Sequence, residues 1–231
     1  GVHPGSAQME TDARTRCWRL TARETRLLLY LAVLGAVVVW KFMPRPWTPT
    51  LTLETAHYSM ASTATSEHTE EIGQVVEGLY LAYSNLLHEL PPVRQPHAHL
   101  KLRLYKDRSE FRRTNPGAGW AEAFYRSPLC HAYFSEDEIN SYHWMLHEAV
   151  HQLNREVAHL DLEPWLDEGL GEYFSTCRIK NNAPVPGTLD PNTYPLWWID
   201  EIATTGNLGA DLKNGSLIPL RAIITGSGGP S

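Results

Sequence analysis

The feature that most constrains this chain of 231 residues is a pair of histidines four positions apart, with a glutamate directly after the first, at residues 147–151 (HEAVH). On an α-helix, residues four apart lie on one face, so His147 and His151 can direct their imidazoles at a single metal ion. Glu148 lies about 100° further round the helix, where its carboxylate can hold a water molecule bound to that ion. The pattern predicts a helix that carries a metal site.

A second pair of charged residues follows within residues 165–174 (WLDEGLGEYF), where Glu168 and Glu172 are again four apart. Two histidines and one glutamate around an open fourth position form a known catalytic zinc arrangement. His143 stands four residues before His147, but three ligands on one straight helix would span about 12 Å, too far for one coordination sphere. We therefore expect His143 beside the metal ligands or at the surface.

Residues 147–153 (HEAVHQL) and 164–174 (PWLDEGLGEYF) together resemble the peptidase MA-like group of gluzincin metallopeptidases. The resemblance implies that His147, His151 and Glu168 bind zinc and that Glu148 is the general base. It implies that Glu172 orients a ligand histidine from the second shell, and that the substrate is a peptide or protein. Candidates for holding the oxyanion of the reaction are Tyr173, Tyr194 and His143.

The sequence departs from the best-known gluzincins in two respects. Only 16 residues separate His151 from Glu168, slightly fewer than usual, and the short connection 156–163 can absorb the difference. The sequence also ends soon after residues 217–221, so we expect a minimal or truncated form of the domain. Two alternatives to a metallopeptidase stay open: a catalytically weak or inactive binding module stabilised by its metal, and a zinc hydrolase acting on a non-peptide amide.

The N-terminal part contains an uninterrupted apolar run at residues 27–40 (LLLYLAVLGAVVVW), preceded by an arginine-rich tail. Extended to residue 43, it corresponds to about 25 Å of helix, against a hydrocarbon core of about 30 Å. No small-residue cleavage site follows, and Trp40, Lys41 and Trp47 are typical of interfacial anchors. We predict a signal anchor or transmembrane helix at residues 27–43, making a single-pass membrane protein with an extracytoplasmic C-terminal domain. Cleavage of a signal peptide and secretion is the alternative, and a buried core helix is a third reading.

The net charge argues against a nucleic-acid partner. Residues 1–46 hold seven basic and three acidic residues, a net charge of +4, which leaves 13 basic and 23 acidic residues, or −10, for the remainder. Nucleic-acid binding requires a basic face, whereas this body is acidic. The sequence makes no prediction of oligomeric state.

Apolar periodicity predicts an α+β fold, in which a small sheet packs on the zinc-bearing helices after one N-terminal hydrophobic helix. Residues 59–65 are expected to form a turn, and a long helix is expected from residue 66 to the prolines at 91–92. The other expected elements are strands at 51–55 and 99–105, a short helix at 107–113, two strands within 121–134, and a metal-bearing helix from 136–137 to 154. The predicted organisation is a tail (1–26), the hydrophobic helix (27–43), a proline-rich linker (44–50), the gluzincin-like domain (51–222) and a flexible tail (223–231).

The three cysteines, Cys17, Cys130 and Cys177, do not stand at metal-ligand spacing. Cys130 and Cys177 could form one disulfide if the body lies outside the cytosol. Two separate buried thiols are the equally open alternative.

Overall fold

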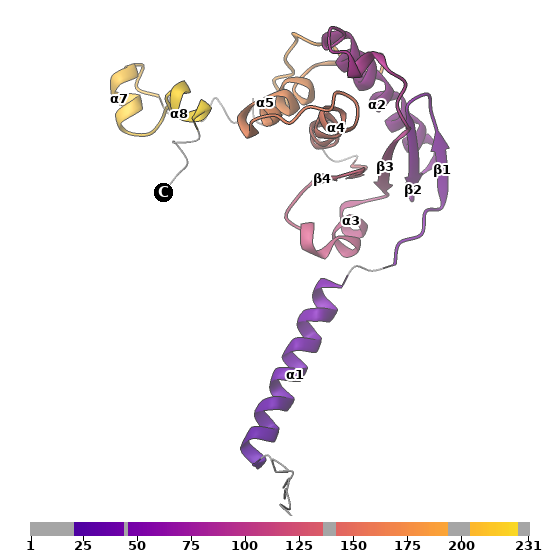
Figure 1. Ribbon diagram of the computed structural model, residues 1–231, viewed down its shortest axis with the longest axis vertical. Helices are drawn as coiled ribbons and strands as arrows, with labels where there is room; N and C mark the ends of the chain where they lie inside the picture. Colours follow the sequence, from indigo (N-terminus) through magenta and orange to yellow (C-terminus); the bar gives the residue numbers. More distant parts are fainter. Residues whose placement is uncertain (1–20, 44–45, 136–141, 194–203, 226–231) are drawn as a thin grey trace, which may run out of the picture. The chain divides into compact units, whose positions relative to one another are not determined.

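The computed structural model describes residues 21–43, 46–135, 142–193 and 204–225 (Figure 1). The chain divides into two compact units, Gly1–Met43 and Pro44–Ser231. The expected helix start at residues 136–137, and the candidate Tyr194, lie outside the described residues.

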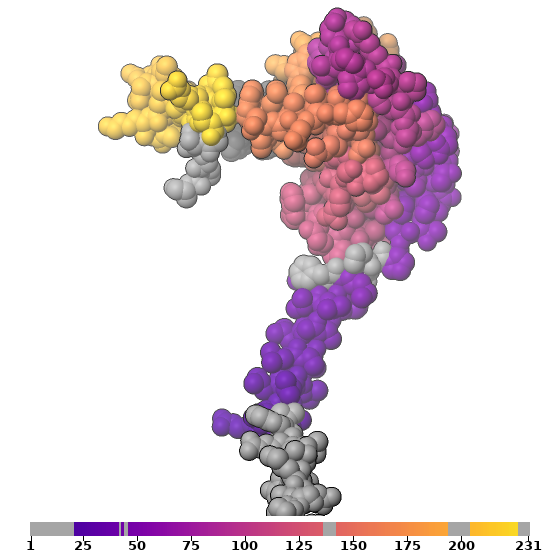
Figure 2. All heavy atoms as spheres, in the orientation of Figure 1, coloured from indigo at the N-terminus to yellow at the C-terminus, as the bar shows by residue number. Residues whose placement is uncertain are grey.

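The first unit contains helix α1 (Ala22–Phe42), which includes almost all of the predicted hydrophobic segment. It begins with a capping box: the Thr21 hydroxyl accepts a hydrogen bond from the Glu24 amide, and the Glu24 carboxylate accepts one from the Thr21 amide. The side chains of residues 22–41 are exposed along the whole helix (Figure 2). Within the described residues, no helix combines the length and apolar character that a membrane span needs.

The second unit is built on a five-stranded sheet with the strand order β1-β2-β3-β5-β4. The three inner strands β2, β3 and β5 are parallel, and the edge strands β1 and β4 pair antiparallel to their neighbours. The strands are β1 (Leu51–Glu54), β2 (Tyr58–Ser62), β3 (Leu100–Tyr105), β4 (Ala123–Arg126) and β5 (Leu129–Tyr133). A mixed α+β fold is therefore confirmed.

Helices α2 (Ser66–Leu86) and α4 (His143–Glu156) cover one face of this sheet (Figure 1). In β3 the leucines alternate with basic residues, so the strand turns a leucine face to the helices, as its sequence predicts. The largest core cluster combines this face with the apolar residues of both helices, including Tyr58, Met60, Leu79, Leu102, Leu146 and Leu153. The fully buried Gln152 of α4 also ties the helix to the sheet, because its amide donates to the carbonyl oxygens of Lys101 (3.0 Å) and Pro128 (2.9 Å).

The opposite face carries a smaller aromatic cluster under helix α3 (Arg108–Thr114), whose N-cap is Asp107. Tyr105, Phe111 and Tyr133 are its buried members, and Trp47 packs against it. Part of the predicted linker is thus packed on the sheet: the centroid of the Trp47 ring lies 5.1 Å from that of Tyr105, and the Arg103 guanidinium lies over the Trp47 ring, 4.7 Å from its centroid.

Helix α5 (Pro164–Ser175) packs against α4 and completes the two-helix unit of the metal motif. The remaining elements are the 3-10 helices η1 (Pro92–Arg94) and η2 (Pro116–Ala118), the hairpin β6 (Ile179–Lys180) and β7 (Ala183–Pro184), and the helices α7 (Leu208–Lys213) and α8 (Leu220–Ile224).

Two predictions about elements were wrong. Residues 59–65 do not form a turn, because most of them belong to the inner strand β2, in which Tyr58, Met60 and Ser62 are buried. The long helix also stops at Leu86 rather than at the prolines; Leu87 is its C-cap, and a turn leads to η1.

Cys130 and Cys177 are both buried free thiols, so the disulfide between them is absent.

Candidate metal centre

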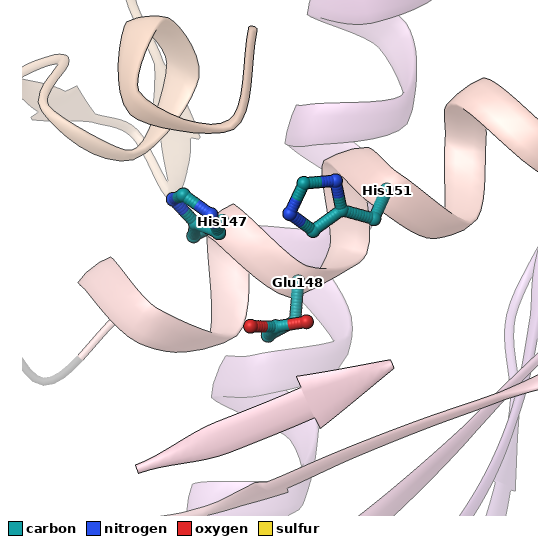
Figure 3. A group of neighbouring side chains, drawn as sticks. All are labelled: His147, Glu148 and His151. Atoms are coloured by element: carbon teal, nitrogen blue, oxygen red, sulfur yellow. The ribbon is translucent and has the colours of Figure 1, made fainter. Parts of the chain in front are cut away.

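The metal motif lies on α4, and its three side chains lie close together. One donor atom each from His147, Glu148 and His151 lie within 4.8 Å of one another, a spacing that could hold a metal ion. Figure 3 shows both imidazoles beside the same stretch of α4, with the Glu148 carboxylate directed toward the neighbouring strand. The 14-residue helix positions them because Leu146, Ala149, Val150 and Leu153, which alternate with the motif residues, are fully buried in the core.

Glu168 of α5 faces both histidines from across the gap between the helices. Its Oε2 lies 3.1 Å from His147 Nε2, and its Oε1 lies 3.7 Å from His151 Nε2. The two Nε2 atoms therefore point at one carboxylate, and a divalent cation between these three groups would find two nitrogen ligands and one oxygen ligand. This donor set suits zinc and other first-row transition metals.

Each histidine also has a second carboxylate of α5 beside its Nδ1 atom. Glu172 Oε1 lies 3.2 Å from His147 Nδ1, and Asp167 Oδ2 lies 3.0 Å from His151 Nδ1. A carboxylate at Nδ1 keeps a hydrogen on that nitrogen and leaves the lone pair of Nε2 for a metal. The residues present thus fit a metal ion, on the ground of both their donor atoms and the groups that orient them.

Gly171 lets α5 approach this closely. A Cβ atom at position 171 would lie 2.9 Å from His147 Cε1 and 3.0 Å from both ring nitrogens. Real Cβ atoms essentially never approach another atom to less than 3.0 Å, and the buried His147 ring has little freedom to move away. The glycine in the WLDEGLGEYF segment therefore provides room for the imidazole between the helices.

Glu148 is directed away from the histidine pair toward the edge strand β4. Its Oε2 accepts a hydrogen bond of 2.8 Å from the backbone N–H of Tyr125. Burial raises the pKa of Glu148, although the two histidines and the Tyr125 amide oppose this effect. A raised carboxyl pKa brings such a group closer to the neutral range in which a general base works best.

The pKa of His147 is raised as well. Burial alone would disfavour the charged imidazole, but the carboxylates of Glu172, Glu148 and Glu168 together outweigh that effect. Four acidic residues around two histidines produce a strongly negative centre, as a site for a cation requires.

The centre opens into a cavity of about 750 Å³. Glu148, His147 and His151 line it together with Glu168, so a molecule in the cavity reaches all of them. The walls combine aromatic, aliphatic and charged side chains: Trp120, Tyr125, Trp144, Leu160, Leu162, Arg155 and Asp161.

The other sequence candidates are less central. His143 is buried, with its ring centroid 6.4 Å from that of His147 and its Nδ1 3.3 Å from the Ser175 carbonyl oxygen, outside the group of donors. Tyr173 is partly exposed and packs edge-on against Phe174 rather than lining the cavity.

Sequence reasoning missed Asp167 and Tyr125. Asp167 could have been found, because a helix that presents Glu168 and Glu172 to a partner also presents positions 167 and 171 to it. Tyr125 contributes a backbone amide, which leaves no trace in the residue type. Searches of family models and of curated proteins gave no match to this chain.

Proposed function

We propose that this protein is a zinc-dependent metallopeptidase, with His147, His151 and Glu168 as metal ligands and Glu148 as general base. The observation that carries the proposal is that the carboxylates of Glu168 and Glu148 lie in different places. Glu168 faces both Nε2 atoms, whereas Glu148 lies on the cavity wall and bonds to a strand amide. A metal site that only stabilised the fold would need no second carboxylate of this kind, whereas hydrolysis by a bound water does.

The side chains would divide the reaction between them. When bound, zinc supplies Lewis acidity toward a water molecule and toward the scissile carbonyl. Glu148 accepts the proton of the attacking water and passes it to the leaving amine. Asp167 and Glu172 hold the two imidazoles in place from their Nδ1 sides throughout.

A peptide substrate is supported by the location of the cavity beside β4. This strand lies at the edge of the sheet, so its outer backbone groups can pair with an extended chain, and Tyr125 also lines the cavity. The family resemblance of residues 147–153 and 164–174 favours the same substrate class. Attachment to a membrane through residues 27–43 stays a prediction.

The test measures bound zinc and the hydrolysis of a mixed peptide pool for the wild type and for Glu148→Gln. We expect the variant to keep its zinc and to lose turnover by about 10²-fold to 10⁴-fold, the usual contribution of a general base. Glu89→Gln, at an exposed position, is the matched control and should behave as the wild type. A zinc-loaded wild type without hydrolysis, or a Glu148→Gln protein with full turnover, would exclude the proposed peptidase.

A further inference from the structure

A series of polar side-chain contacts connects His151 with the interior of the domain. His151 Nδ1 lies 3.0 Å from Asp167 Oδ2, and Asp167 Oδ1 accepts from the Asn154 amide nitrogen at 2.7 Å. The Asn154 amide oxygen then accepts from the Tyr83 hydroxyl at 2.6 Å. The series crosses three elements, from α4 and α5 to α2, and ends at a residue that does not line the cavity.

The chemistry of these groups allows one direction of hydrogen bonding. The ionised Asp167 carboxylate only accepts, so Asn154 must turn its NH₂ group toward Asp167 and its oxygen toward Tyr83. The Tyr83 hydroxyl donates to that oxygen. A flipped amide would turn the Asn154 oxygen toward the Asp167 carboxylate and so place two acceptors together. At the other end, the Asp167 carboxylate lies at ion-pair distance, 3.0 Å, from His151 Nδ1, which makes no hydrogen bond within the described residues. A negative group at this place favours a hydrogen on Nδ1, which leaves the lone pair on Nε2, the nitrogen that faces Glu168.

Tyr83 is well placed to keep this direction. Its side chain is fully buried, and Asn154 is 2% exposed, so an unpaired polar atom in either would be costly. Burial, assisted by the negative Asp167, raises the pKa of Tyr83, so the hydroxyl keeps its hydrogen at any physiological pH.

The second histidine lacks such a series among the described residues. Glu172 contacts His147 Nδ1 at 3.2 Å, but its other oxygen is buried without a hydrogen-bond partner in that part of the chain. The two carboxylates beside the histidines thus differ in their support: within the described residues, Asp167 is hydrogen-bonded to the buried Asn154, whereas Glu172 Oε2 is bonded to no side chain.

We infer that Tyr83 is a positioning residue for the metal centre, acting through Asn154 and Asp167 to hold His151 in its metal-binding orientation. This inference rests on the proposed zinc site. It assigns a role to a buried tyrosine that lies 71 residues from Asn154 in the sequence and makes no contact with the proposed ligands in the hydrogen bonds described.

The test is a double-mutant cycle in the full chain, with the zinc dissociation constant measured by competition with a chromophoric chelator. Asp167→Asn and Glu172→Gln should each weaken zinc binding by about 10-fold to 100-fold. Tyr83→Phe should weaken it by about 3-fold to 10-fold, since it removes one buried hydrogen bond. In the Asp167→Asn background, Tyr83→Phe should add less than about 2-fold, whereas in the Glu172→Gln background it should keep its full effect.

Tyr105→Phe is the matched control. Tyr105 is also fully buried, and its hydroxyl is hydrogen-bonded to His131 Nδ1 at 3.0 Å. The loss of this hydroxyl therefore removes buried hydrogen bonding without reaching the metal centre. We expect the zinc affinity of this variant to equal that of the wild type. The double variant Tyr83→Phe/Asn154→Leu removes the buried hydroxyl together with the amide that it contacts, so neither of these two groups is left unpaired in the core, and it should bind zinc no better than Tyr83→Phe.

Several results would overturn the inference. One is wild-type zinc affinity in folded Tyr83→Phe or in the double variant with Asn154→Leu, and another is an equal effect of Tyr83→Phe in the two carboxylate backgrounds. A wild-type protein that binds no zinc would overturn the proposed function together with this inference, whereas the first two results leave the proposed function standing.

Discussion

At the scale of single residues, the close contact between Gly171 and the His147 ring leads to a sharp prediction. Gly171→Ala should push the imidazole out of place, lower the free energy of unfolding by about 1–3 kcal/mol through overpacking, and weaken zinc binding by about 10-fold or more. Chemical denaturation and zinc titration of the purified variant measure the two effects.

Gly169→Ala is the internal control for that substitution. It lies in the same helix, but a Cβ at position 169 meets no other atom within 4 Å. Because alanine favours helix over glycine, this variant should be more stable by about 0.5–1 kcal/mol, with unchanged zinc affinity. Equal behaviour of the two variants would contradict the packing account.

The buried His131 should make the free energy of unfolding depend on pH. Burial, helped by Arg103 and Arg126, lowers its pKa from 6.5 to about 4, and its ring stacks on that of Phe124 at 4.3 Å. Below pH 6.5 the unfolded chain takes up a proton that the folded protein refuses until about pH 4. The free energy of unfolding should therefore fall across this window as the pH falls, by up to about 3 kcal/mol from this residue.

The measurement is the unfolding free energy of wild type and His131→Gln between pH 4 and pH 7. In the variant, the free energy of unfolding should change less steeply with pH, by the slope that the uptake of about one proton produces. The substitution His88→Gln, at an exposed position, is the control. An unchanged slope in His131→Gln would rule out this source of the pH dependence.

The sequence was informative about residues whose type and spacing serve one chemistry. His147, Glu148, His151 and Glu168 could be proposed together because helical spacing places each pair on one face. Asp167 was missed although it lies on the same face of its helix as Glu168 and Glu172. Tyr83 was missed because its partner Asn154 lies 71 residues away in the sequence. Contacts of this kind are made by tertiary packing, which no local pattern records.

At the scale of elements, a bound metal would join α4 to α5, and stability should report this. Zinc at about 100 times its dissociation constant should raise the free energy of unfolding by about 2.7 kcal/mol. Glu168→Gln should remove most of this gain by weakening the link from α5, without changing the stability of the metal-free protein by more than about 0.5 kcal/mol, since the side chain is 64% exposed.

Glu163→Gln supplies the comparison in the same helix. Glu163 is exposed, stands at the N-cap of α5 and makes no capping hydrogen bond through its side chain. Thermal unfolding with and without zinc should show the full gain for this variant. A full gain in Glu168→Gln as well would remove Glu168 from the set of ligands.

The elements differ in how well their sequences predicted them. Strand β3 was found because its leucines alternate with basic residues, so one face is visibly apolar. Strand β2 was missed because the polar residues Ser59 and Ser62 interrupt its apolar pattern, although it lies between β1 and β3 in the sheet. The buried Ser62 hydroxyl is hydrogen-bonded to the Thr69 hydroxyl at 2.8 Å. Small hydroxyl side chains suit an inner strand once a partner is present, but in the sequence they are typical of turns.

At the scale of the whole molecule, the division at Met43 allows the predicted membrane attachment to be tested separately from the metal centre. Both core clusters draw all their members from residue 47 onward. We expect the full chain to float with lipid vesicles in a density gradient through residues 27–43, and a chain beginning at Pro44 to remain at the bottom with unchanged zinc affinity. A full chain that also stays at the bottom would contradict the attachment.

Because the Tyr125 amide is hydrogen-bonded to Glu148, exchange of its hydrogen can report the position of the Glu148 carboxylate. That amide lies on an edge strand, and a side chain rather than a neighbouring strand accepts its hydrogen bond. Its exchange with deuterated solvent is slow only while the carboxylate stays in place. Isotope exchange at a single peptide group therefore follows the position of Glu148, the proposed general base, without any substrate being added.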